Sequence, residues 1–321
     1  MEYPIDKSTD GKSVLEVTKT LGISRALLKH LKFLENGITV NGKRVTVRYR
    51  LKEGERLSLA VEDFAPQENL LPVSLDLPLV YEDGDVAVPN KPADMPTHPS
   101  HNHRGDTVAN ALAFRYAKAD VPFIFRPVNR LDRNTSGLLI IAKNRIAAAK
   151  LADAMKSGKI RKTYLAILVG ELSCEEGLIR TYMRRTAESI IVRENCAEGE
   201  GGDLALTRFR VLLRKNGHTL VCASPITGRT HQLRVHFAGL GCPILGDDLY
   251  GEASPLIGRH ALHSARLSFP RVSDGRIETV LAPLPEDMHR AAEQLFGACE
   301  VAESLNRLST YAEALLSPTE G

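Results

Sequence analysis

One aspartate, Asp132, lies between Arg130 and Arg133 in the segment Arg126–Lys143, RPVNRLDRNTSGLLIIAK. Neighbouring cations favour the charged form of a carboxyl group, so the segment predicts an ionised aspartate. In a cleft, such a carboxylate is available as a nucleophile rather than as a general acid. On an exposed loop the same residues form only surface ion pairs, and their spacing alone leaves both interpretations open.

A second segment with chemical potential is Ser224–His236, SPITGRTHQLRVH. Thr230 is placed to cap a helix that begins at His231, which leaves Arg229 just before the helix N-terminus. A guanidinium and free backbone N–H groups in that position bind an anion, either a phosphate or the carboxylate of Asp132. A capped amphipathic helix with solvated arginines is the alternative interpretation.

The elements around these two segments predict an α+β fold with a mainly antiparallel, mixed sheet. Short helices are expected at 145–157 and 230–238, in an irregular order that lacks strict βαβ alternation. No glycine-rich phosphate-binding motif opens a helix, so no nucleotide cofactor is expected. The expected strands are GLLIIAK, KTYLAILVG, RFRVLL and TLVCAS.

The N-terminal segment has a different pattern, with two short helices followed by a hairpin. Residues 12–50 carry nine lysines and arginines against two glutamates, in a chain whose net charge is only +3. A local basic block of this kind indicates a polyanion-binding module, although a basic stripe on a lone helix is more often a solvated face. Asn41-Gly42 predicts the hairpin turn. The candidate phosphate-binding side chains are Arg25, Lys29, Lys32, Lys43 and Arg44.

The segment GKSVLEVTKTLGISRALLKHLKFLENGITVNGKRVTVRYRLKEGERL resembles the small RNA-binding domain named after ribosomal protein S-four. The resemblance covers nearly the whole N-terminal module and implies binding to structured RNA, mainly through phosphates. The expected organisation is an RNA-binding domain over 1–64, a linker over 65–78, a catalytic domain over 79–288 and a helical extension over 289–321.

Several segments of the larger part, in order, resemble the RluA/RluD family of RNA pseudouridine synthases. They are NKPADMPTHP, NRLDRNTSGLLIIAKN, KTYLAILVG, PITGRTHQLRVHFAGLGCPILGDDLYG and RHALHSARLSFP. The resemblance implies isomerisation of uridine to pseudouridine in RNA without a cofactor. The uracil is detached from the ribose, turned over and rejoined through carbon five.

The resemblance also implies roles for individual residues. Asp132 matches the family's catalytic aspartate, Arg229 the arginine that pairs with it, and Tyr164 the tyrosine that stacks on the uracil. Arg130 matches the arginine that fills the space left by the flipped-out nucleotide, which costs a few kcal/mol to extrude. One carboxylate can attack the sugar or the base, or remove a sugar proton, and the sequence does not choose among these steps.

Two positions depart from the commonest family pattern: Asn129 stands where histidine is frequent, and Asp94 where glycine is usual. A non-catalytic RNA-binding or ribosome-assembly factor on the same fold is the alternative function, and a nucleoside or glycoside hydrolase is another. A hydrolase normally needs two carboxylates, and only one acid stands at the centre of the motif. Ribosomal RNA is favoured over transfer RNA as the substrate.

The amino-acid composition narrows the cellular location and the class of protein. The chain is 43% hydrophobic and 25% charged, with no apolar segment long enough to span a membrane and no apolar leader at its N-terminus. Five scattered cysteines argue against a disulfide framework, so a cytoplasmic location is expected. A monomer is the default expectation for the oligomeric state. His98, His101 and His103 share a loop but lack co-ligands at metal-binding spacing, so no metal is expected.

Overall fold

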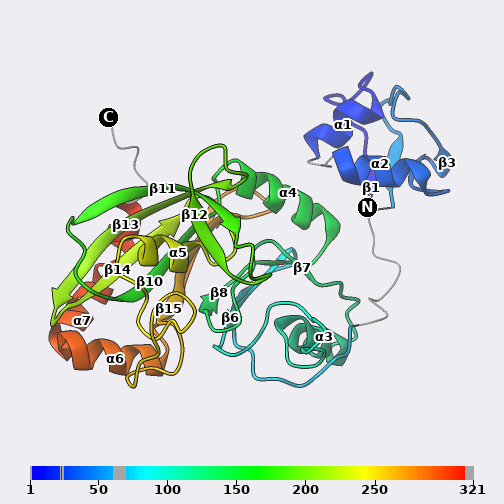
Figure 1. Ribbon diagram of the computed structural model, residues 1–321. Coiled ribbons are helices and arrows are strands. Elements are labelled where there is room, and N and C mark those ends of the chain that lie inside the picture. The colour runs from blue at the N-terminus through cyan, green and yellow to red at the C-terminus, as the bar shows by residue number, and fades with distance from the viewer. Residues whose placement is uncertain (1, 22, 24, 61–69, 315–321) are drawn as a thin grey trace.

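The computed structural model describes residues 2–21, 23, 25–60 and 70–314. Its N-terminal part is a four-stranded antiparallel sheet with strand order β1-β4-β2-β3, together with two helices (Figure 1). A separate core of leucine, isoleucine and valine side chains holds these elements together. The elements are β1 (Glu2–Pro4), α1 (Val14–Thr20), α2 (Arg25–Phe33), β2 (Ile38–Val40), β3 (Lys43–Arg44) and β4 (Arg56–Leu59).

Local sequence explains the ends of these elements. Ser13 caps α1, and Glu16 returns a hydrogen bond to the Ser13 backbone, which satisfies two N–H groups at the start of the helix. Asn41 and Gly42 both adopt positive φ, 49° and 79°, as the tight turn between β2 and β3 requires. The predicted hairpin turn is therefore confirmed, and it places Lys43 directly after the turn.

The larger part is built on a twelve-stranded sheet whose main order is β12-β11-β13-β14-β10-β15-β8-β6-β9-β7. Every strand pairing in it is antiparallel except that of β15 with β8, so the predicted α+β fold with a mixed, mainly antiparallel sheet is confirmed. The strands are β5 (Leu79–Glu82), β6 (Val86–Lys91), β7 (Arg126–Pro127), β8 (Ser136–Leu138), β9 (Ile141–Ala142), β10 (Arg161–Val169), β11 (Glu176–Arg185), β12 (Arg193–Cys196), β13 (Asp203–Lys215), β14 (His218–Pro225), β15 (Leu262–Pro270) and β16 (Ile277–Leu281).

Helices cover both faces of this sheet (Figure 1). On β13, Phe209 meets Phe237 of α5 edge to face, whereas the next residue, Arg210, lies against the Tyr311 ring of α8. Because successive strand residues point to opposite faces, α5 and α8 lie on opposite sides of the sheet. The helices are α3 (Val108–Lys118), α4 (Arg145–Lys156), α5 (Gln232–Gly239), α6 (Glu286–Phe296), α7 (Ala298–Asn306) and α8 (Leu308–Ala314).

One local prediction is wrong. Helix α5 begins at Gln232, and its N-cap is His231, which adopts a left-handed φ of 58° and makes no side-chain capping bond. Thr230 is therefore not the cap. The Gln232 side chain instead accepts hydrogen bonds from the Arg229 backbone and from Thr227, and this holds the turn before the helix.

The predicted domain limits of 1–64, 79–288 and 289–321 stay predictions. Residues 61–64, 65–69 of the expected linker, and 315–321 lie outside the described residues. Residues 70–78 run beside α3, where the Asn110 side chain donates to the Leu71 carbonyl and the Val73 N–H donates to the Asn110 carbonyl. Among the described residues, no helix combines the length and apolarity that a bilayer crossing requires.

Candidate active site

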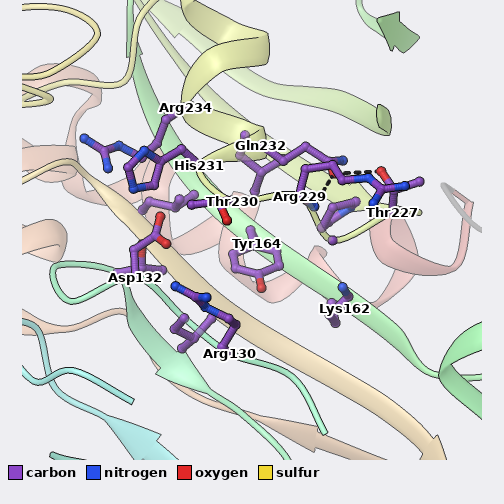
Figure 2. A pocket seen from close by; sticks show the side chains of 16 residues that line it. Arg130, Asp132, Lys162, Tyr164, Thr227, Arg229, Thr230, His231, Gln232 and Arg234 are labelled. Carbon is purple, nitrogen blue, oxygen red and sulfur yellow. Dashed lines mark hydrogen bonds between the residues drawn. The ribbon is translucent and has the colours of Figure 1, made fainter. Parts of the chain in front are cut away.

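Asp132 is half-buried in the loop between β7 and β8 and lines a pocket at the middle of the large sheet (Figure 2). Hydrogen bonds between two side chains and the backbone on either side of Asp132 hold this loop. The Thr97 hydroxyl donates to the Leu131 carbonyl at 3.0 Å and accepts from the Leu131 N–H at 3.3 Å. Lys91 donates to the Arg133 carbonyl at 2.8 Å. The position of the carboxylate is therefore set by both neighbouring residues of the chain.

The following turn is fastened by two buried histidines, one just before β15 and one within it. Thr135 hydrogen-bonds His260 at 2.8 Å, and Ser136 hydrogen-bonds His263 at 2.9 Å. Burial lowers the pKa of these histidines to about 3 and about 4, so both rings are neutral near pH 7. They serve as structural hydrogen-bonding groups.

Tyr164 reaches the same pocket from β10 and is only 7% exposed. The pairing of β10 with β15 shifts register between Thr163 and Tyr164, and such a bulge redirects the side chains beside it. Burial, together with the negative charge of Asp132, raises the pKa of Tyr164, so its hydroxyl stays protonated. The ring is a neutral aromatic surface facing the pocket.

Arg229 lines the pocket, but it does not make the expected pair with Asp132. Its guanidinium lies 3.2 Å from the Asp203 carboxylate and donates to the Leu204 carbonyl at 3.1 Å. Figure 2 shows Arg229 directed away from Asp132, toward Thr227. The turn before α5 directs the Arg229 side chain away from Asp132, because this turn faces β13 and not the loop that contains Asp132.

Arg234, which the sequence analysis did not single out, is the buried cation on the Asp132 side of the pocket. It forms two 2.7 Å hydrogen bonds with Asp247. Burial alone would lower its pKa, but Asp247, aided by the charge of Asp132, raises the pKa of Arg234 above its usual value. The available sequence signal was an arginine between Leu233 and Val235 in an apolar helix, because a buried cation needs an anionic partner.

His231 is a second pocket residue that the sequence analysis did not assign to the site. Its Nδ1 lies 2.8 Å from the Tyr250 hydroxyl, which also accepts a hydrogen bond from the Arg193 backbone. Burial lowers the pKa of His231, and the charge of Asp132 opposes that effect. Figure 2 shows the imidazole close to Asp132.

Two more cations complete the lining of the pocket. Arg130 is exposed beside Asp132, whereas Lys162 is 8% exposed, and burial lowers the pKa of its amine to about 8. Among the described lining residues, Asp132 is the sole carboxylate. This arrangement does not fit the two-carboxylate hydrolase considered from the sequence.

The two departures from the family pattern both lie next to the Asp132 loop. Asp94 adopts a φ of 61°, a conformation that glycine takes most easily, and its carboxylate lies 2.6 Å from Arg133. The Asn129 side chain accepts a hydrogen bond from the Ile140 N–H at 2.8 Å. Asn129 therefore ties the start of the loop to the strand region that follows it.

The expected N-terminal RNA-binding side chains lie on α2 and β3. Lys29, Lys32, Lys43 and Arg44 are exposed, and the Arg44 guanidinium donates to the Lys32 carbonyl at 3.1 Å, which joins the hairpin to the end of α2. The backbone of Arg25 begins α2, but its side chain lies outside the described residues.

The three histidines of the 98–103 loop have separate partners. His98 packs edge to face against Phe125, and His103 lies 2.6 Å from Asp106. In the described part of the chain, no group of three or more histidine, cysteine, aspartate or glutamate side chains is arranged to hold a metal ion.

Comparison with known proteins identifies the class to which this fold and pocket belong. A family model described as RNA pseudouridylate synthase matches residues 85–239. A Bacillus subtilis protein named uncharacterized RNA pseudouridine synthase YjbO is 38% identical over 278 residues, which cover 87% of this chain and 97% of the relative. Ribosomal large subunit pseudouridine synthase D of Vibrio cholerae is 34% identical over 308 residues, 90% of each chain.

Solved structures agree. Human RNA pseudouridylate synthase domain containing 1 is 31% identical, with a TM-score of 0.54 over 65% of this chain and 83% of the human one. The chain therefore belongs to the RNA pseudouridine synthase family and is an isomerase that converts uridine in RNA to pseudouridine. The resemblance to the RluA/RluD group is confirmed.

Proposed function

We propose that this chain modifies one or more uridines of structured ribosomal RNA, using Asp132 as the nucleophile on a uridine flipped out of its helix. The observation that carries this proposal is the convergence on one pocket of Asp132, the Tyr164 ring and the buried cation Arg234. Each comes from a different element, the β7–β8 loop, β10 and α5, and a pure RNA binder needs no such combination.

The reaction needs little acid–base chemistry beyond one carboxylate. The bond from the ribose C1′ to N1 of uracil breaks, the base turns over, and a bond forms from C1′ to C5. The proton of C5 leaves, and N1 gains a proton, so atoms and charge balance without a cofactor. As the nucleophile, Asp132 attacks C1′ and displaces uracil through N1; the bond from C1′ to the Asp132 oxygen then breaks when C5 attacks C1′, which restores the carboxylate. Tyr164 stacks on the detached uracil so that it stays in the pocket.

The remaining pocket residues stabilise negative charge or fill the space that the flipped-out nucleotide leaves. We assign the electrostatic partner of Asp132 to Arg234, because its guanidinium is fixed by Asp247 in a site shielded from water. Arg229, at the exposed edge of the same pocket, binds the phosphate next to the target nucleotide. Arg130 occupies the gap that the extruded nucleotide leaves in the RNA helix.

The N-terminal part, 1–64, is proposed as an S-four-type module that binds RNA phosphates through Arg25, Lys29, Lys32, Lys43 and Arg44. The support is the exposure of the last four side chains on adjoining elements. Ribosomal RNA is preferred to transfer RNA because several relatives are named large ribosomal subunit pseudouridine synthase D. A monomer in the cytoplasm completes the proposal.

The test is the Asp132→Asn variant assayed on ribosomal RNA transcripts labelled with tritium at C5 of uridine. Isomerisation replaces the C5 proton, so turnover releases tritium into water. The variant should release none, yet bind the transcript within about twofold of the wild-type affinity, because one amide replaces one carboxylate among many phosphate contacts. Asp153→Asn, at an exposed aspartate on α4, is the matched control and should retain full activity.

Release of tritium by Asp132→Asn at the wild-type rate would remove Asp132 from the nucleophile's role. A wild-type protein that binds the transcript but releases no tritium would favour the RNA-binding or assembly factor as its function. Sites converted in ribosomal RNA are then mapped by comparing cells with and without the protein.

A further inference from the structure

The hairpin of β11 and β12 ends in two isoleucines that are exposed to solvent. β11 and β12 pair from Tyr182 with Cys196 to Arg185 with Arg193, and residues 186–192 connect them. We call residues 186–192 the tip. Within the tip, Ile190 is 78% exposed and Ile191 is 59% exposed. Two adjacent large apolar side chains kept in water mark a surface that meets a partner.

The tip is held in one conformation by its own polar groups. The Arg193 guanidinium donates to the backbone carbonyls of Ile190, Ile191 and Val192 at 3.3, 3.0 and 3.1 Å. The Ser189 hydroxyl accepts hydrogen bonds from the N–H groups of Ile191 and Val192 at 3.2 and 3.1 Å. The isoleucines are therefore presented on an ordered loop, which reduces the entropy lost on binding.

The end of the hairpin next to the tip is fastened to the active site. The Arg193 N–H donates to the Tyr250 hydroxyl at 2.9 Å, and that hydroxyl lies 2.8 Å from Nδ1 of the pocket residue His231. β12 also packs closely on α5, because a Cβ added at Gly239 would lie 2.5 Å from the Asn195 side chain. Two hydrogen bonds thus connect Arg193, the residue directly after the tip, to the pocket that contains Asp132.

Two arginines that face each other next to the tip, Arg185 and Arg193, offer a position for one phosphate. Arg184, Arg185 and Arg193 lie at the end of the hairpin, and Arg184 is paired with Glu194 at 2.8 Å. Arg185 stands directly opposite Arg193 across the two strands, an arrangement of like charges that costs free energy in the isolated protein. A phosphate beside Arg185 would relieve that repulsion.

We propose that the tip is a substrate-recognition element whose two isoleucines insert against the RNA bases that flank the target uridine, while Arg185 binds the adjoining phosphate. The inference rests on the proposed function and specifies how the same site selects structured RNA. Apolar side chains inserted between bases stabilise an unstacked step, and flipping a uridine out of a helix requires such unstacking. The tip therefore offsets part of the cost of base flipping and is dispensable for an RNA that is already single-stranded.

The test uses the double variant Ile190→Ser/Ile191→Ser and two RNAs that contain a uridine converted by the wild-type protein: a hairpin and a short single strand of the same sequence. On the hairpin, kcat/KM should fall about tenfold, since the helix must open without the apolar insertion. On the single strand the fall should stay below about twofold. Ile277→Ser, at an isoleucine on β16 that is 61% exposed and lines no part of the pocket, is the matched control and should behave as wild type.

A second readout is the fluorescence of 2-aminopurine placed next to the target uridine in the hairpin. Binding of wild type should raise it through unstacking, and binding of the double variant should not. Equal rates and equal fluorescence for wild type and the double variant, with tritium still released, would overturn this inference and leave the proposed function intact. If the wild-type protein released no tritium, both this inference and the proposed function would be refuted. A wild-type dimer that the double variant abolishes in sedimentation would assign the tip to self-association and also overturn the inference.

Discussion

Replacing the buried Lys91 with methionine should change how the free energy of unfolding depends on pH. Lys91 is fully buried, and its Nζ donates to the carbonyls of Pro92 and Arg133, both at 2.8 Å. Burial, helped by the positive charge of Arg259, lowers the pKa of Lys91 to about 7. In the unfolded chain the same amine titrates near 10.4.

The sign follows from the two pKa values. From about pH 7 to about pH 10 the unfolded chain holds the proton on Lys91 and the folded protein does not, so the free energy of unfolding rises with pH. Below that window the folded protein carries the full cost of a buried ammonium group. With about 1.4 kcal/mol for each unit between the two values, this cost is about 5 kcal/mol.

Methionine has nearly the same length but no proton to exchange. The variant should therefore lose the contribution of Lys91 to the pH slope, about 1.4 kcal/mol per pH unit at its steepest. It also leaves two carbonyls without a donor, at about 1–3 kcal/mol each, which offsets much of the gain from removing the charge. The difference in slope is thus the informative quantity, more than the stability at any one pH.

The measurement is urea unfolding followed by circular dichroism at pH 7, 8 and 9, for wild type, Lys91→Met and the control Lys118→Met. Lys118 is exposed at the end of α3, so its replacement should leave the wild-type slope unchanged. Parallel lines for wild type and Lys91→Met would refute the reasoning, because they would show that Lys91 keeps its proton equally in both states.

Three further outcomes test other parts of the molecule. Replacing both Lys29 and Lys32 with alanine should reduce the slope of log RNA affinity against log salt concentration by about 1.4 to 1.8, as measured by filter binding. The rate on a short accessible RNA should not change. An unchanged slope would contradict the role of α2 in RNA binding. Asp247→Ala leaves the Arg234 guanidinium buried without its anion, so chemical unfolding should report a loss of about 3–5 kcal/mol, and a smaller loss would argue against a buried ion pair. Gly137→Ala should fail to fold or be severely destabilised in thermal unfolding, since its Cβ would lie 2.3 Å from a carbonyl oxygen of β15, and a wild-type melting temperature would show that the β8–β15 contact is wrong.

Local signals were sufficient where the structure depends on local geometry. The Asn41-Gly42 turn and the strands around Tyr164 could be predicted because turn residues and apolar runs act over a few neighbours. The same reasoning failed at the start of α5. A threonine before a helical pattern predicts an N-cap at Thr230. In the structure the Gln232 side chain accepts a hydrogen bond from the preceding turn, and His231 is the N-cap.

The candidate site likewise combines residues that the sequence indicated with contacts that only the structure revealed. The sequence indicated Asp132, Tyr164 and the family chemistry from ordered motifs, each of which lies within one short segment. It implied that Arg229 pairs with Asp132, and we propose Arg234 in that role instead, because only the path of the chain decides which of two arginines five residues apart faces the carboxylate. The tertiary structure directs Arg229 to Asp203 and buries Arg234 between Asp247 and the pocket.

By itself the sequence determined which residue types are available and predicted the α+β class from local patterns, and the reaction was implied by a family resemblance that rests on several short motifs in order. Only the tertiary structure decided that Arg229 contacts Asp203, that Lys91 supports the neighbouring carbonyl, and that the β11–β12 hairpin joins the pocket through Tyr250. The physical reason is that hydrogen bonds and charges act over a few ångströms in space, between groups that can lie more than a hundred residues apart in the chain.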